Sequence, residues 1–195
     1  ALATFDLATA GVTVGTAALT ISGTGTWTPS AAVSVSTGSV IFGGAAEVDG
    51  TIEFTGNGTL NQAANNVTIT AVDLNANTVI VSGTGVISST VYLDAPGELD
   101  VDGSFTIDGT LSLGGTGTAV IDLTSTETLT LGNSAADALV NTAAVTLELD
   151  GAGGTLVFPA LVTLGASLTL DNTTSAGTLD WTAVTDFTAS ATATF

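Results

Sequence analysis

Residues 99–116, LDVDGS FTIDGT LSLGGT, consist of three six-residue units in a row. In each unit the first and third residues are apolar and the fifth is glycine. Successive side chains of a β-strand point to opposite sides, so both apolar residues of a unit point to the same side. Glycine suits a corner because it tolerates positive φ and close approach of another backbone. Each unit therefore predicts a short strand followed by a corner.

A longer period of 18 residues, which is three units, links similar strings elsewhere in the chain. If each unit is one side of a coil, residues 18 apart lie above one another in neighbouring coils. This predicts an all-β fold, a single parallel β-solenoid with three-sided coils of about 18–21 residues, stacked about 4.8 Å apart. The apolar column expected from this period comprises Leu93, Leu111, Leu129 and Leu147.

The same 18-residue period predicts how charge is arranged on the outside of the coils. Like charges on neighbouring strands destabilise a sheet, and here neutral residues would separate the two acids of an outer column. The expected outer column comprises Asp94, Ser112, Thr130 and Glu148.

The repeat extends over most of the 195 residues, which we interpret as one solenoid domain. Residues 1–30 are a looser version and predict irregular first coils, whereas 31–173 predict regular coils. Residues 174–195 predict terminal strands available for contact between subunits. Within the regular part, 62–66 predict a longer corner or surface loop, and 134–142 predict a helical turn or an outward loop.

The charge balance excludes several partners. The chain has 18 acidic residues and no Lys, Arg or His. It lacks the cations that neutralise phosphates, so nucleic acid is excluded as a partner and an anionic membrane surface is disfavoured.

Absence of Cys removes disulfides, thiolate nucleophiles and sulfur metal ligands. No stretch approaches the roughly 20 apolar residues of a membrane helix, so no membrane insertion is expected.

The last nine residues alternate strictly and contain no glycine. Neither end of the chain has the polar capping unit that keeps a solenoid monomeric. The alternatives are a domain cut from a longer protein, or ends that pair with neighbouring copies and build a filament. In the second case the self-assembly residues are the apolar ones of the final segment, Phe187, Ala189, Ala191, Ala193 and Phe195.

Two acidic pairs are candidates for calcium binding. Asp100 and Asp102, and likewise Glu47 and Asp49, place two carboxylates beside a glycine. Calcium takes six to eight oxygen ligands, so either pair is an incomplete shell. The alternative interpretation is that these side chains solvate the outer surface. Apart from calcium, no cofactor is expected.

Catalysis is not expected, because a Ser or Thr nucleophile would have no His or Lys to activate it. Glycoside hydrolysis by two carboxylates remains open, with Asp100 and Asp102 as the obvious pair. A sugar groove also needs aromatic platforms, and the few candidates are scattered. We interpret Trp27 and Trp181 as core or corner packing.

Three strings carry a resemblance to a known class of proteins: GTLSLGGTGTAVIDL (109–123), SVIFGGAAEVDGTIEFTGNGTL (39–60) and GGTLVFPALVTLGASLTLDN (153–172). They resemble repeats of autotransporter passenger domains and of filamentous-haemagglutinin-type surface proteins, over most of 31–173. The resemblance implies a parallel β-helix on the cell exterior, used as a stalk, adhesin or fibre. Such passengers usually retain some Lys and Arg, and this chain has none.

The function expected from the sequence is that of a structural subunit of an extracellular, self-assembling filament, whose partner is the same chain. The extracellular location rests on a composition rich in Gly, Thr, Ser, Ala and Asn. A monomeric adhesin that binds surface glycans is the main alternative. A carbohydrate-active enzyme is a minor one.

Overall fold

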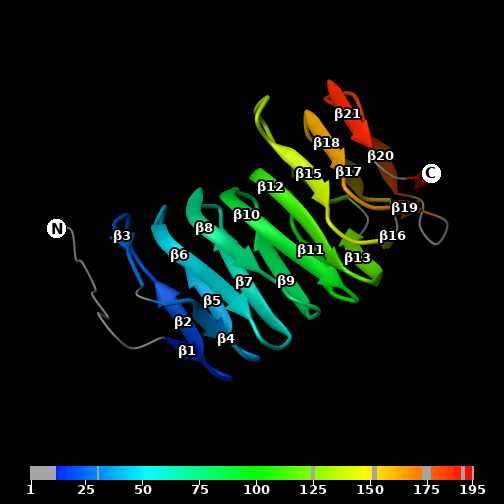
Figure 1. The fold of residues 1–195 in the computed structure, drawn as a ribbon. Coiled ribbons are helices and arrows are strands. Elements are labelled where there is room, and N and C mark those ends of the chain that lie inside the picture. Colours follow the sequence, from blue (N-terminus) through cyan, green and yellow to red (C-terminus); the bar gives the residue numbers. More distant parts are fainter. Residues whose placement is uncertain are drawn as a thin grey trace.

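In a computed structural model the chain is an all-β parallel solenoid of about eight turns, and its strands follow one another along the axis in sequence order (Figure 1). The structure describes residues 12–29, 31–123, 126–150, 153–172, 177–189 and 192–194. Among these residues no helix is long and apolar enough to cross a membrane.

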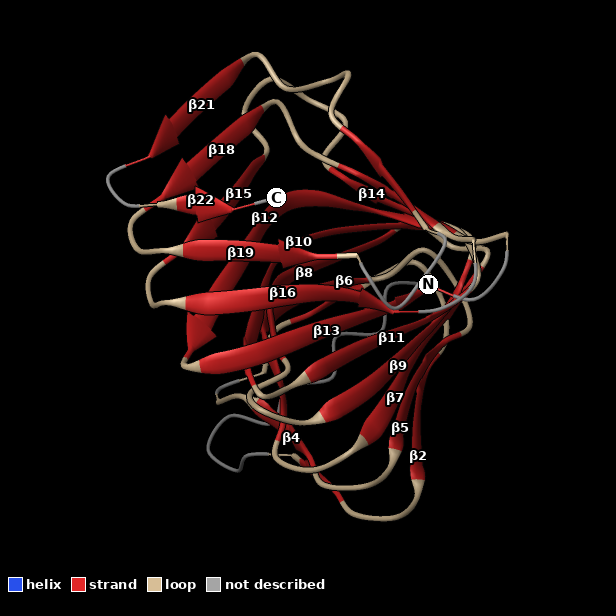
Figure 2. Cartoon of the chain, turned by 90° about the vertical axis from the view of Figure 1, so that its right-hand side faces the viewer, coloured by secondary structure: helices blue, strands red, loops and turns tan. Residues whose placement is uncertain are grey.

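Each coil passes through three faces in a fixed order. The first and second faces belong to a thirteen-stranded sheet, and the third face is a nine-stranded sheet whose strands lie side by side (Figure 2). Four long strands turn the corner between the first two faces without a break. In β12 this corner lies at Gly109, since Ile107 pairs with Leu131 and Thr110 pairs with Ala138 of a different strand.

The strands divide among the three faces. The first face contains β3 (Thr26–Trp27), β14 (Thr128–Leu131), β17 (Thr155–Val157) and β20 (Thr178–Asp180). The second face contains β1 (Thr13–Val14), β4 (Val33–Val35), β15 (Ala138–Asn141), β18 (Leu161–Leu164) and β21 (Asp186–Ala189). Both faces are spanned by β6 (Glu47–Phe54), β8 (Val67–Asp73), β10 (Val86–Ala95) and β12 (Phe105–Gly115). The third face contains β2 (Ala18–Ile21), β5 (Ser39–Phe42), β7 (Gly58–Ala63), β9 (Thr78–Gly83), β11 (Glu98–Asp102), β13 (Gly117–Leu123), β16 (Val145–Asp150), β19 (Leu168–Asp171) and β22 (Ala193–Thr194).

The three units of residues 99–116 form three consecutive sides of the solenoid, as predicted. The first unit lies on β11, and the second and third are the two halves of β12. At the first corner Gly103 has a φ of 128°, and a Cβ there would collide with the backbone oxygen of Gly83 in the coil below. The inward residues of the three units are all buried, namely Leu99, Val101, Phe105, Ile107, Leu111 and Leu113.

The 18-residue period does not describe how the coils stack, and this prediction was wrong. Leu111 pairs with Val91 in the coil before it and with Leu139 in the coil after it, so the spacings are 20 and 28 residues. Sides recur locally every six residues, but corners differ in length. The first two faces are separated by residues 108–109 in β12 and by residues 132–137 in the next coil. Coils therefore lengthen toward the C-terminal end, beyond the predicted 18–21 residues.

The insertion at 132–137 accounts for part of the segment in which a helical turn or an outward loop was expected. Residues 133–136 are an exposed loop, and 138–141 are strand β15. The buried Asp137 carboxylate accepts hydrogen bonds from the backbone N–H groups of Asn133 and Ser134, both at 2.7 Å. The loop is thus closed by its own side chain, and the strand resumes at once.

The loop predicted at 62–66 is a tight corner instead. Gln62 belongs to β7 and its side chain is fully buried. Asn65 closes the corner, because its side-chain N–H donates to the backbone oxygens of Phe42 and Gln62 at 3.0 and 3.1 Å. The chain enters β8 at Val67, only four residues after β7 ends.

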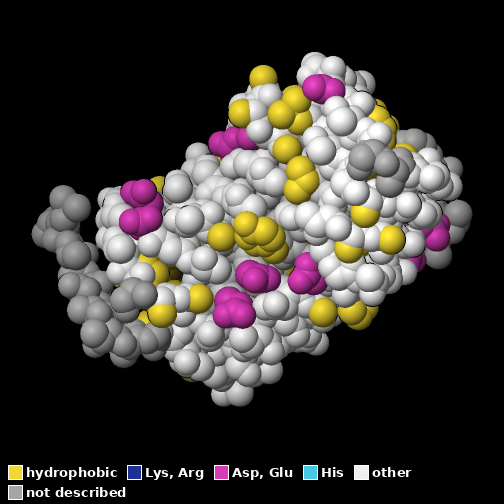
Figure 3. Space-filling view, viewed as in Figure 1, with side chains coloured by type: hydrophobic (Ala, Val, Ile, Leu, Met, Phe, Trp, Pro, Cys, Tyr) yellow, Lys and Arg dark blue, Asp and Glu magenta, His cyan; other side chains and the backbone are white. Residues whose placement is uncertain are grey.

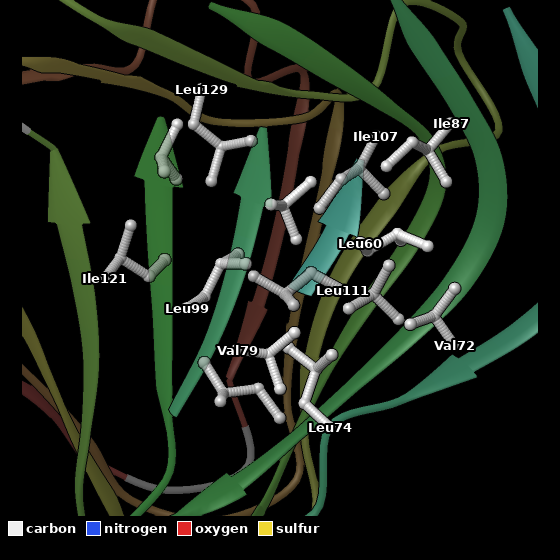
Figure 4. Close-up of a cluster of buried hydrophobic side chains, with 14 of the residues drawn as sticks. Leu60, Val72, Leu74, Val79, Ile87, Leu99, Ile107, Leu111, Ile121 and Leu129 are labelled. Atoms are coloured by element: carbon white, nitrogen blue, oxygen red, sulfur yellow. The ribbon is translucent and has the colours of Figure 1, made fainter. Parts of the chain in front are cut away.

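The core consists of apolar columns that run along the axis, in which side chains from the three faces meet (Figure 4). Fully burying one such side chain stabilises the fold by about 1.5–3 kcal/mol. One column, called here the second-face column, continues without a register shift over eight coils. It comprises Val33, Ile52, Val72, Val91, Leu111, Leu139, Val162 and Phe187. All of these residues except Phe187 are buried.

Candidate assembly surfaces

The C-terminal coil contributes the last described strand of each of the three faces. Among the described strands, β20, β21 and β22 each pair with one strand only, in the coil before them. Phe187 continues the second-face column above Val162, but it is 43% exposed whereas Val162 is 1% exposed. The column therefore ends at this surface in a partly uncovered aromatic ring.

The structure divides the predicted self-assembly residues between two faces. Phe187 and Ala189 lie on β21 of the second face, and Ala193 lies on β22 of the third face. Ala191 and Phe195 lie outside the described residues. The alternating segment is therefore not one long strand, because β21 and β22 belong to different sheets.

The N-terminal coil presents the matching edges. Among the described strands, β1 and β2 of this coil each pair with one strand only, in the coil that follows, and so does β3 of the second coil. Val12 and Leu19 are partly buried apolar residues that pack against the core from this end. The sequence-based prediction expected both ends to pair with neighbouring copies, but it named no residue at this end. The alternating stretch Val12-Thr13-Val14 is the signal that could have indicated it.

The two ends differ in charge. Asp6 is the one acidic residue before Glu47, so the other seventeen of the eighteen lie from Glu47 onward. The C-terminal coil carries Asp180 and Asp186. The backbone N–H of Thr182 donates to Asp180 and lowers the pKa of that carboxyl below its ordinary value, so it is charged at neutral pH. Figure 3 shows acidic groups scattered over the visible face and no cationic side chain.

The acidic residues of the third face stack directly on one another. Asp100 pairs with Asp122, and Asp122 pairs with Asp150. The expected separation of acids by neutral residues is therefore wrong for this face. The predicted outer column does not exist either, since Asp94 pairs with Gly114 and Glu148 with Val120.

The calcium candidates remain two separate pairs. Glu47 and Asp49 lie on β6 of the thirteen-stranded sheet, and Asp100 and Asp102 lie on β11 of the nine-stranded sheet. Glu47 accepts a hydrogen bond from the hydroxyl of Thr26 at 2.8 Å. No group of three or more His, Cys, Asp or Glu side chains that could hold a metal occurs in the part of the chain that the structure describes.

The aromatic residues pack as interpreted from the sequence. Trp27 is buried in the core, and Trp181 stacks on Phe158 with ring centroids 3.7 Å apart and an interplanar angle of 7°. A cavity in the middle of the core is lined only by apolar side chains, among them Leu60, Leu74 and Phe105. Neither feature brings an aromatic platform or a polar group to the Asp100–Asp102 pair.

No family model, curated protein or solved structure matches this chain.

Proposed function

We propose that the chain is a structural subunit of an extracellular filament, built by stacking copies of the solenoid end to end. The observation that carries the proposal is the presence, at both ends, of parallel strand edges on the second and third faces. A strand edge offers a row of backbone N–H and C=O groups to any further strand that can pair with it. An added copy extends the ladder and covers the apolar ends of the core columns.

The composition supports a structural role outside the cell. A chain without Cys or Met has no thiol or thioether to oxidise, and one without Lys or Arg has no cleavage site for trypsin-like proteases. The net charge of −18 opposes association through self-repulsion, so assembly is expected to increase as salt screens the charges.

Electron microscopy of the purified chain at neutral pH tests the proposal. The samples are prepared at low and at physiological salt, each with and without a calcium chelator. Long uniform fibres support a structural polymer. Loss of the fibres with the chelator would show that metal ions bridging carboxylates are needed for assembly. Discrete rods roughly 40 Å long, from about eight coils at ~4.8 Å each, would overturn the filament and favour the monomeric adhesin.

A further inference from the structure

The second faces of neighbouring copies supply a specific contact, whose identification rests on the proposed function. We propose that β21 of one copy pairs in parallel with β1 of the next, so that the second-face column runs unbroken from one copy into the other. The interface is head to tail: the C-terminal coil of each subunit binds the N-terminal coil of its neighbour. The occupant of the Phe187 surface is thus a second copy of this chain.

The register of the second face identifies the residues that meet. Thr13 pairs with Ser34 and Val14 with Val35, which places Val12 in line with Val33 at the start of the column. At the other end Val162 pairs with Phe187 and Thr163 with Thr188. One more step of the same ladder places Phe187 over Val12 of the next copy and Thr188 over its Thr13. The exposed ring then contacts a partly buried valine.

The direction of the strands favours head-to-tail over tail-to-tail contact. Every strand pairing in the structure is parallel, and only a head-to-tail junction preserves this across the interface. Tail-to-tail contact would make the facing strands antiparallel and close a dimer. A head-to-tail interface is heterologous and leaves a free surface at each end, so growth continues.

Charge favours the same polarity. Tail-to-tail contact would bring Asp180 and Asp186 of one copy against those of another, with no cation in the chain to neutralise them. Residues 12–46, which build the first two coils, contain no acid. Head-to-tail contact therefore places an acidic surface against a neutral one. The first face is not included in the pairing, because there the described strands begin one coil later, at β3.

Cysteine cross-linking tests the contact directly, because the chain has no Cys of its own. Thr13 lies on β1 and Thr188 on β21, and both are exposed. These two strands lie at opposite ends of the subunit (Figure 1). In the proposed interface their Cα atoms lie about 4.8 Å apart, within the range of a disulfide. The variant carrying Thr13→Cys and Thr188→Cys is expected to give a ladder of covalent oligomers on non-reducing gels. The matched control combines Thr13→Cys with Thr163→Cys, one coil deeper at roughly 10 Å, beyond disulfide reach.

The outcomes separate this contact from the filament itself. Fibres that form without the Thr13–Thr188 cross-link overturn the contact and leave the filament standing. Absence of fibres from the unmodified chain under all conditions overturns both. Covalent dimers from Thr188→Cys alone, at the level of the double variant, would indicate tail-to-tail contact and overturn the proposed polarity.

A second pair of variants measures the role of the aromatic ring. Phe187→Ala is expected to raise the critical concentration for assembly at least about tenfold, with little change in thermal unfolding of the subunit. Tyr92 is equally exposed, at 43%, but lies on the side of the solenoid. Tyr92→Ala is therefore expected to assemble like the unmodified chain. Equal effects of the two substitutions would contradict a contact centred on Phe187.

Discussion

Asp122 lies directly against Asp100 in the parallel ladder of the nine-stranded sheet, with both carboxylates on its outer side. Burial raises the pKa of both carboxyls above 3.8, and neighbouring acids raise it further: Asp122 and Glu98 act on Asp100, and Asp150 acts on Asp122. The folded chain thus binds protons at these two sites more tightly than the unfolded chain does. Ionisation of Asp122 and Asp100 at neutral pH therefore costs stability.

Asp122→Asn is expected to stabilise the fold at pH 7, by about 0.2–1 kcal/mol for each like-charge pair it removes. Because the pKa of Asp122 is raised in the folded state, protonation of this carboxyl stabilises the fold. That stabilisation is fully present below about pH 3.8 and is lost as pH rises through the pKa of Asp122 in the folded state. The unmodified chain should therefore gain stability as pH falls, and its difference from Asp122→Asn should shrink. Thermal unfolding at pH 7 and pH 3 measures both effects.

Asp49→Asn is the control for a general change of net charge. Asp49 is exposed, lies on the other sheet and contacts the hydroxyl of Thr70 at 3.5 Å. The Asp49→Asn substitution removes one negative charge, as Asp122→Asn does, but this charge lies outside the stacked acids. Equal stabilisation by both substitutions would assign the effect to the net charge and not to the ladder.

Gly103→Ala is expected to destabilise the fold by about 1–3 kcal/mol or more, through steric overlap and strain at positive φ. The cause is the backbone of Gly83 in the coil below, because a Cβ at position 103 would overlap its carbonyl oxygen. Gly15→Ala is the matched control, since a Cβ there has no atom within 4 Å and no left-handed φ is required. It should change stability by less than about 0.5 kcal/mol in urea unfolding. Equal losses of stability in the two variants would show that neighbouring coils are not tightly packed at Gly103.

Asn141 occupies a column position that is leucine in both neighbouring coils, Leu113 and Leu164, yet it is buried with 2% exposure. Its side-chain N–H groups donate to three backbone oxygens, those of Ala143, Ala166 and Ser167, at 3.0–3.2 Å.

Asn141→Asp keeps the shape of the side chain but replaces the donor with a carboxylate that faces those carbonyl oxygens. A loss of about 3 kcal/mol or more is expected at pH 7, with partial recovery in acid as the carboxyl protonates. Asn66→Asp should be nearly neutral in the same urea unfolding measurement, because Asn66 is exposed and its side-chain oxygen, which accepts from the N–H of Val86 at 3.2 Å, is kept by the carboxylate. Stability of Asn141→Asp that does not depend on pH would contradict the buried environment.

The sides of the solenoid were predictable and their vertical stacking was not, for a physical reason. Alternation and glycine corners are local, so LDVDGS FTIDGT LSLGGT identifies its inward residues without reference to any other coil. Stacking depends on how many residues each corner holds, and residues 132–137 insert four more than the equivalent corner in β12. The residues of this corner, GNSAAD, show no pattern that distinguishes a wide corner from a new strand.

The candidate assembly surface was predictable only in part, because alternation is local whereas stacking depends on the other coils. Alternation identified Phe187, which the structure places at the open end of a column. It did not identify Val12, because three alternating residues are too few to stand out in a chain rich in Val and Thr. The partner of Phe187 depends on the register of the whole second face, which becomes visible only when all the coils are stacked.

That register can be tested in the core by a double-mutant cycle. Leu111 and Leu139 are register partners, 1% and 0% exposed, although they lie 28 residues apart. Leu111→Ala and Leu139→Ala should each cost about 2–5 kcal/mol, and the double variant should depart from their sum by more than about 0.5 kcal/mol, because the two cavities merge. Leu111→Ala with Val40→Ala is the control, since Val40 is buried on the third face several coils away. Those two losses should add, because no side chain is shared. Additivity of Leu111 with Leu139 would mean that the column is not continuous at this coil, and the alignment of Phe187 with Val12 of the next copy would lose its basis.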